Sequence, residues 1–193
     1  MLSSEESLKI LKETKALIEG HFILSSGLHS PKYVQCAQLM SKPIQAAQIC
    51  QSLVKKIQSN FNNIDLILSP AMGGVVIGYE IGKLMGVETI FSERVNGKFQ
   101  LRRDFKINQN TDVLIVEDVI TTGKSSIECS KLVTKNKANI VGYACIIDRS
   151  SGNIEISEKI ISQIKLNIPT YKKENLPKEL ISIDPVKPGS RNL

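Results

Sequence analysis

Two adjacent carboxylates stand directly before a hydroxyl-rich turn in VLIVEDVITTGKSS, residues 113–126. Glu117 and Asp118 close an apolar run typical of a buried strand, and the hydroxyls and the glycine that follow precede a predicted helix. Carboxylates in such a place accept hydrogen bonds from a cis-diol or act as outer ligands of Mg²⁺, while the N–H groups of a helix start bind one phosphate. A phosphate, a diol and Mg²⁺ together describe a ribose 5-phosphate that carries a leaving group.

The same segment ends in Gly-Lys-Ser, as the phosphate loop of ATPases and GTPases does. That loop requires another glycine five residues before Gly123, and Asp118 holds this position. Because Glu117 adds a second negative charge at the mouth of the loop, the segment would repel a triphosphate. The sequence therefore argues against a nucleoside triphosphatase.

Strands alternate with helices through the middle of the chain. The predicted strands are 65–70, 88–93, 112–118 and 138–148. The predicted helices are 42–59, with Pro43 in the first turn, 73–86, ended by Gly86, and 124–136. This alternation is typical of an α/β fold with a central parallel sheet flanked by helices.

The two ends of the chain are less regular. We expect an amphipathic helix over residues 3–18, capped by Ser4, and then two extended pieces around a Gly/Ser/Pro turn. Residues 159–171 predict one or two antiparallel strands, and residues 176–183 predict a short helix. The domain prediction is a single domain, 1-193, with a core of about 42-150 and a small hood formed by 1-41 and 151-193.

Composition narrows the class of protein. The net charge is +6, but the lysines are scattered over predicted helix faces and aromatic residues make up only 5%, so we expect no nucleic-acid partner. The first ten residues have no apolar stretch, and no apolar run is long enough to span a bilayer, so we expect a cytoplasmic protein with no membrane contact. The four cysteines form no C-x-x-C pair and are expected to be buried, reduced thiols.

The strand, the Glu-Asp pair and the Val-Ile-Thr-Thr-Gly turn resemble the phosphoribosyl pyrophosphate (PRPP) signature of the type I phosphoribosyltransferases. The resemblance implies that family's fold, PRPP as a substrate and Mg²⁺ as the cofactor, with no metal held directly by protein side chains. It makes Asp118 a catalytic residue as well. The residues that it directs at PRPP are Glu117, Asp118, Val119, Ile120, Thr121, Thr122, Gly123, Lys124 and Ser125.

The acceptor base is indicated by the segment HFILSSGLHSPKYVQC, residues 21–36, which resembles the N-terminal segment of orotate phosphoribosyltransferases. In that family the segment covers the pyrimidine ring. The resemblance assigns orotate to Tyr33, Thr121 and Arg149, the last as the partner of the orotate carboxylate. A plain β-hairpin remains the alternative for the segment, and a structural salt bridge remains the alternative for Arg149.

Two further segments resemble the parts of the family that handle pyrophosphate. SPAMGGVVIG, residues 69–78, matches the pyrophosphate loop, with Met72 and Gly73 as binding residues and a cis peptide expected near Ala71–Met72. FSERVNGKFQLRRDF, residues 91–105, resembles the flexible catalytic loop, in which Lys98 is the favoured catalytic residue and Arg94 the second candidate. A solvated β-hairpin is the alternative for this segment.

The sequence departs from the best-known form of the family where Ser25 and Gly73 replace lysines. Either Arg102 and Arg103 substitute for those lysines, or PRPP binds without efficient turnover. The implied reaction joins orotate to PRPP, giving orotidine 5′-monophosphate and pyrophosphate in pyrimidine biosynthesis. The resemblance also implies a homodimer in which the loop 94–110 reaches the neighbouring site. A transferase for another base and a PRPP-binding regulator without turnover remain open.

Overall fold

A computed structural model describes residues 1–24, 26–150 and 154–188. Within these ranges the main sheet has six strands, in the order β5-β4-β3-β6-β7-β8. Only β5 runs antiparallel to its neighbour. The strands are β3 (Leu66–Pro70), β4 (Glu88–Val95), β5 (Lys98–Leu101), β6 (Asp112–Ile120), β7 (Asn139–Asp148) and β8 (Ile160–Lys165). The predicted α/β class with a central, mostly parallel sheet is confirmed.

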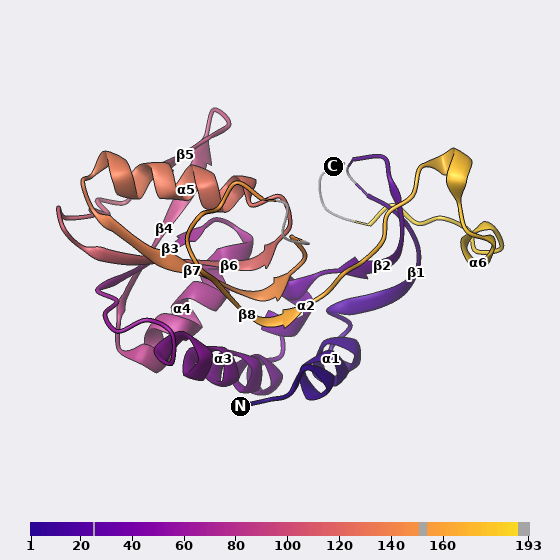
Figure 1. The fold of residues 1–193 in the computed structure, drawn as a ribbon, viewed down its shortest axis with the longest axis horizontal. Helices are drawn as coiled ribbons and strands as arrows, with labels where there is room; N and C mark the ends of the chain where they lie inside the picture. Colours follow the sequence, from indigo (N-terminus) through magenta and orange to yellow (C-terminus); the bar gives the residue numbers. More distant parts are fainter. Residues whose placement is uncertain (25, 151–153, 189–193) are drawn as a thin grey trace.

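Helices cover both faces of this sheet (Figure 1). One face carries α3 (Pro43–Gln58) and α4 (Gly73–Met85), and the other carries α5 (Lys124–Lys135). Successive side chains of a strand point to opposite faces, so along β6 the residues Leu114 and Val116 pack with the first pair of helices while Val113 and Ile115 pack under α5. Burial on both sides explains the unbroken apolar run before Glu117.

The helix starts and stops of the core follow the sequence closely. Pro43 lies in the first turn of α3, and α4 ends at Gly86, whose φ of 69° is left-handed. A left-handed residue after the last helical turn is the ordinary role of glycine, because it lacks a Cβ. A short extra helix, α2 (Cys36–Met40), precedes α3 and was not predicted.

The first helix is shorter than predicted. It spans Ser4–Glu13 as α1, with Ser3 and not Ser4 as the N-cap in a capping box with Glu6. The prediction that it continues to residue 18 is wrong, because Lys15 turns left-handed at φ 58° and the next residues pair into a strand. Sheet pairing thus prevails over the helical periodicity of this segment.

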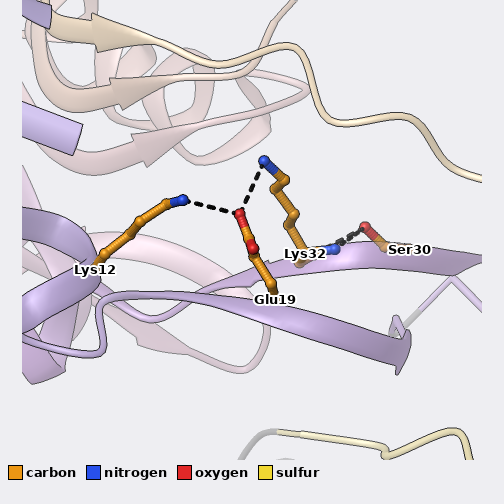
Figure 2. Close-up of polar contacts among 4 residues, drawn as sticks. All are labelled: Lys12, Glu19, Ser30 and Lys32. Atoms are coloured by element: carbon orange, nitrogen blue, oxygen red, sulfur yellow. Dashed lines mark hydrogen bonds and ion pairs between the residues drawn. The ribbon is translucent and has the colours of Figure 1, made fainter. Parts of the chain in front are cut away.

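The strand pair β1 (Leu17–Ile23) and β2 (His29–Val34) forms a separate antiparallel hairpin. Glu19 of β1 accepts two ion pairs at the same oxygen, from Lys12 Nζ of α1 at 3.0 Å and from Lys32 Nζ of β2 at 3.3 Å (Figure 2). Ser30 Oγ donates to the Lys32 carbonyl at 2.8 Å. Because these charges are exposed, they orient the hairpin on α1 more than they stabilise it.

The C-terminal part both extends the sheet and completes the hood. The strand β8 runs parallel to β7, so the prediction of antiparallel strands is wrong for it. The connection after β7 returns the chain to the middle of that strand, where Ile160 pairs with Tyr143, and β8 then runs in the same direction as β7. The short helix α6 (Lys178–Ile181) follows a 3₁₀ turn at Lys173–Asn175.

The hood hairpin and the C-terminal segment lie side by side (Figure 1). His29 exchanges backbone hydrogen bonds with Tyr171, and Ile23 N donates to the Val186 carbonyl at 2.9 Å. The division into a core of about 42–150 and a hood remains a proposal, and the sheet itself continues to Lys165. In the described part of the chain, no helix has the length and apolarity needed to cross a membrane.

Candidate active site

The acidic pair at the end of β6 is divided between the two faces of the sheet. Glu117 lies toward α5, where its Oε2 accepts a hydrogen bond from Ser126 Oγ at 2.6 Å. Asp118 lies toward the start of α4, close to Gly73, and its Oδ1 accepts from the Val119 N–H at 2.8 Å. Consecutive strand residues must face opposite ways, so the pair places one carboxylate beside each of two helix starts.

Burial changes the acidity of both carboxyl groups. Desolvation raises the pKa of Glu117 to about 7, since the opposing effects of the Ser126 hydroxyl and the Arg94 charge are smaller. Desolvation also raises the pKa of Asp118, against the Val119 N–H that favours its charged form. A ligand that supplies hydroxyl donors or positive charge would therefore stabilise the charged form of both carboxyl groups.

Replacing Glu117 by glutamine is expected to stabilise the ligand-free protein by roughly 2–3 kcal/mol at pH 8 and by much less at pH 5. The pKa of Glu117 is raised from 4.5 to about 7 on folding, so its favourable contribution is fully present below pH 4.5 and is lost as pH rises through 7. Urea unfolding at the two pH values measures the difference. An equal stability change at both, or the same pattern in the exposed control Glu13→Gln, would refute the burial argument.

The turn after β6 has the features of a phosphate site. Thr121 and Thr122 are exposed, and Gly123 adopts a left-handed φ of 71° as it enters α5. No side chain caps the start of this helix. The Lys124 N–H donates to Thr122 Oγ1 at 3.4 Å, and the next N–H groups of the helix start are available to an anion, in the segment 121–125 for which the sequence predicts a phosphate site.

A second uncapped helix start lies at the 71–74 turn. The peptide bond between Ala71 and Met72 is cis, as predicted, and α4 begins at Gly73 with no side-chain cap. A Cβ on Gly73 would lie 2.9 Å from both carboxylate oxygens of Asp118, closer than such atoms approach. In this conformation a side chain at position 73 would force the Asp118 carboxylate to shift. The other departure from the family pattern, Ser25, lies outside the described residues.

Within residues 91–105, residues 92–101 pair as the β-hairpin that the sequence left as the alternative to a flexible loop. Asn96 and Gly97, at φ 50° and 78°, make a two-residue turn between β4 and β5. Arg94 is ion-paired with Glu128 at 2.7 Å. Lys98 lies at the start of β5, where its backbone pairs with Val95, and its exposed side chain makes no hydrogen bond or ion pair with the residues described here.

Of the two arginines after β5, one has a carboxylate partner and the other has none, as is the case for Arg94 and Lys98. Arg103 forms a two-pronged contact with Glu93, at 3.2 and 3.0 Å. Arg102 is exposed and has no such partner among the described residues. The structure therefore pairs Arg94 and Arg103 with carboxylates and leaves Lys98 and Arg102 without a carboxylate partner among the described residues.

Arg149 follows β7 directly, and its backbone N–H donates to the Ile120 carbonyl at 2.8 Å. The side-chain Nε is shielded from solvent and makes no hydrogen bond in the described structure, and burial lowers the pKa of this arginine. The adjacent Asp148 instead lies 4.0 Å from Lys165. Arg149 therefore forms no structural salt bridge, the alternative for this residue, with the residues described. The donors of its guanidinium suit a carboxylate ligand.

Tyr33 contacts its own hairpin and makes no hydrogen bond with the other site candidates in the described structure. Its ring packs on Phe22 of the same hairpin, with centroids 5.7 Å apart, and no hydrogen bond joins it to Arg149 in the described part of the chain. The chain after Tyr33 does approach the acidic pair, because Cys36 Sγ lies 4.0 Å from the Asp118 carbonyl. The hairpin is thereby connected to the site through its C-terminal end.

Comparisons with known proteins agree with this geometry. A family model described as the phosphoribosyl transferase domain matches residues 37–178. The orotate phosphoribosyltransferase of Methylorubrum extorquens is 44% identical over 193 residues, covering 100% of this chain and 98% of the relative. That of Parvibaculum lavamentivorans is 42% identical and covers 100% of both chains. The chain belongs to the orotate phosphoribosyltransferase family.

Solved structures extend the comparison to the fold. The crystal structure of orotate phosphoribosyltransferase from Aeropyrum pernix has a TM-score of 0.72 at 21% identity, covering 82% of this chain and 92% of that one. An adenine phosphoribosyltransferase from Thermoanaerobacter pseudethanolicus also matches, with a TM-score of 0.59 at 19% identity over 70% of this chain and 88% of that one. These likenesses establish the phosphoribosyltransferase fold and do not distinguish the base.

Two residues near the site of this phosphoribosyltransferase were not anticipated from sequence. Ser126 holds Glu117, and Glu128 holds Arg94. Both lie in the first two turns of α5, and the only signal was the position of this helix directly after the phosphate turn.

All four cysteines are buried free thiols, as predicted.

Proposed function

We propose that the protein transfers the 5-phosphoribosyl group of PRPP to orotate, giving orotidine 5′-monophosphate and pyrophosphate in de novo pyrimidine biosynthesis. The observation that carries the proposal is the divided acidic pair. Glu117 lies beside the start of α5 and Asp118 beside the 71–74 turn, so a ribose between them has a phosphate site on one side and a pyrophosphate site on the other. The full-length relatives named for this activity support the choice of base.

In this proposal PRPP is held at three places. Residues 121–125 bind the 5-phosphate through the start of α5, and Met72 and Gly73 offer backbone N–H groups to the pyrophosphate. The carboxylates of Glu117 and Asp118 accept hydrogen bonds from the 2′ and 3′ hydroxyls. As the C1′–O bond weakens ahead of attack, the two negative charges stabilise the positive character of the ribose.

The residues present are compatible with Mg²⁺ as the cofactor. In the described structure no group of three His, Cys, Asp or Glu side chains is placed to hold a metal ion. The oxygen donors that we assign to Mg²⁺ are Glu117 and Asp118, together with those of the substrate. These two would hold the ion through water and substrate oxygens. Bound there, Mg²⁺ would neutralise part of the negative charge on the pyrophosphate.

Orotate is placed by residues on the far side of the ribose. Arg149 pairs with the orotate carboxylate, Thr121 contacts the ring and Tyr33 belongs to the segment that covers it. Arg149 and Thr121 follow adjacent parallel strands, because Ile120 and Asp148 are register partners. Fixing N1 opposite C1′ accounts for much of the acceleration without a protein nucleophile. Lys98 and Arg94 assist the departing pyrophosphate, and the Lys98 side chain has no ion pair among the described residues.

A homodimer is part of the proposal, with the 94–110 hairpin reaching the neighbouring site. Its support is an exposed apolar stripe along α4 and the residue before it, formed by Met72, Val76 and Tyr79, at 85%, 52% and 66% exposure.

Replacing Tyr79 by aspartate is expected to raise the dimer dissociation constant at least about tenfold, since it puts a charge in the stripe. Sedimentation of Tyr79→Asp and of the control Glu88→Gln measures this, and an unchanged constant would place the interface elsewhere. The free thiols support a cytoplasmic location.

Pyrophosphate release from PRPP with orotate, uracil, adenine and hypoxanthine tests the assignment of the base. We expect release with orotate alone. Release with a purine instead would favour the alternative of a transferase for another base. Tight PRPP binding without release with any base would favour a regulator.

A further inference from the structure

Arg94 of the hairpin is held by three parts of its own chain. Its Nη1 lies 2.7 Å from Glu128 Oε2 on α5 and donates to the Gly97 carbonyl of the turn at 2.8 Å. The guanidinium carbon also lies 4.1 Å from the ring centroid of Phe99, its partner across the hairpin. A charge, a backbone acceptor and an aromatic face together fix the plane of the guanidinium.

Glu128 depends on Arg94 in return. Its Oε2 is shielded from solvent and makes no hydrogen bond in the described structure, so the Arg94 guanidinium, whose Nη1 lies 2.7 Å away, balances its charge as an ion pair. The Glu128 side chain is 24% exposed, whereas the Arg94 side chain, at 38%, is in contact with solvent. A carboxylate in such a place loses more when its partner leaves than an exposed one does, so the pair favours one fixed arrangement.

The pair lies beside the acidic end of β6. The Arg94 charge is close enough to lower the pKa of Glu117, and the helix that carries Glu128 also carries Ser126, which binds Glu117. Helix α5 is therefore connected both to the carboxylate proposed for the ribose and, through Arg94, to a cation proposed for the pyrophosphate of the neighbouring site.

We propose that Glu128 is a positioning residue for pyrophosphate: it holds Arg94 by Nη1, so that Nε and Nη2 are presented to the leaving group in a fixed orientation. In the described structure these two nitrogens make no hydrogen bond. A guanidinium has five N–H donors, so it binds one carboxylate and still offers a pair of donors to a phosphate oxygen. Fixing the side chain in advance removes the entropy cost of ordering it on binding. This inference rests on the proposed function for the identity of the ligand.

Glu128→Gln keeps the shape of the side chain and removes its charge. We expect the dissociation constant of magnesium pyrophosphate, measured by calorimetry, and the KM for PRPP to rise about tenfold, as for the loss of one charge-assisted contact. The KM for orotate should not change. Glu128→Asp, which keeps the charge, should recover part of the loss. Glu93→Gln is the matched control, because it removes the carboxylate partner of Arg103 and should leave pyrophosphate binding unchanged.

A double-variant cycle separates positioning from general damage to the fold. If Glu128 acts through Arg94, then Glu128→Gln has no further effect on pyrophosphate binding in an Arg94→Met protein. Equal or tighter binding by Glu128→Gln alone, or a full loss that persists in the Arg94→Met background, would overturn the proposal. Calorimetry needs no turnover, so absence of orotate consumption by the unaltered protein would defeat the proposed function without deciding the role of Glu128.

Discussion

Replacing Arg149 by alanine is expected to lower kcat/KM for orotate by about 10²–10³-fold, because a buried carboxylate of the substrate would lose its charged partner. Arg149 follows β7 with its Nε shielded from solvent and without a hydrogen bond in the described structure. A buried donor without a hydrogen bond costs free energy until a ligand accepts from it. The KM for PRPP should change little, since the residues proposed for PRPP lie on other turns. Steady-state kinetics with each substrate varied in turn measures both constants.

The variants Arg149→Lys and Lys165→Ala sharpen this experiment. Lysine keeps the charge but cannot make the two-pronged contact, so it should recover only a small part of the activity. Lys165 is a nearby exposed cation that lies 4.0 Å from Asp148, and its loss should have no effect. If Arg149→Ala raised the KM for PRPP as much as that for orotate, Arg149 would not be the orotate anchor.

Gly73→Ala should lower kcat/KM for PRPP by roughly 10²-fold, although it adds a single methyl group. The new Cβ would meet both oxygens of Asp118 at 2.9 Å, so the carboxylate must rotate away and lose its bond from the Val119 N–H. The ribose would then lose one of its two carboxylates. PRPP binding and steady-state kinetics measure the effect.

The dependence of this effect on Asp118 gives the control. In an Asp118→Ala protein there is no carboxylate to displace, so adding Gly73→Ala should cause little further loss. A large additional loss in that background would mean that Gly73 acts through its own backbone contacts. Unfolding of the single variants in urea shows whether either change reduces stability.

Sequence reasoning predicted the core of the candidate site because its residues are consecutive. The strand 112–118, the turn after it and the glycines at 73 and 74 each carry a local signal, and the structure places these segments at the same edge of the sheet. The cis bond at Ala71–Met72 followed from the family resemblance. None of these predictions required knowledge of distant contacts.

The contacts that sequence reasoning missed join residues far apart in the chain. Glu128 meets Arg94 only because the β4–β5 hairpin packs against α5, and no periodicity encodes that pairing. The direction of β8 was likewise decided by the path of the chain after Asp148, and the end of α1 by strand pairing at Leu17. Local patterns specify elements, whereas tertiary packing decides ends, directions and partners.

The most direct test of the account is the absorbance of orotate after the protein is mixed with PRPP and Mg²⁺, with the product identified by mass. We predict a loss of absorbance that requires both additions and yields orotidine 5′-monophosphate. Arg149→Ala should abolish it under the same conditions. No loss in the unaltered protein, while PRPP binding remains measurable, would contradict the assignment of an orotate transferase and leave a PRPP-binding protein of another kind.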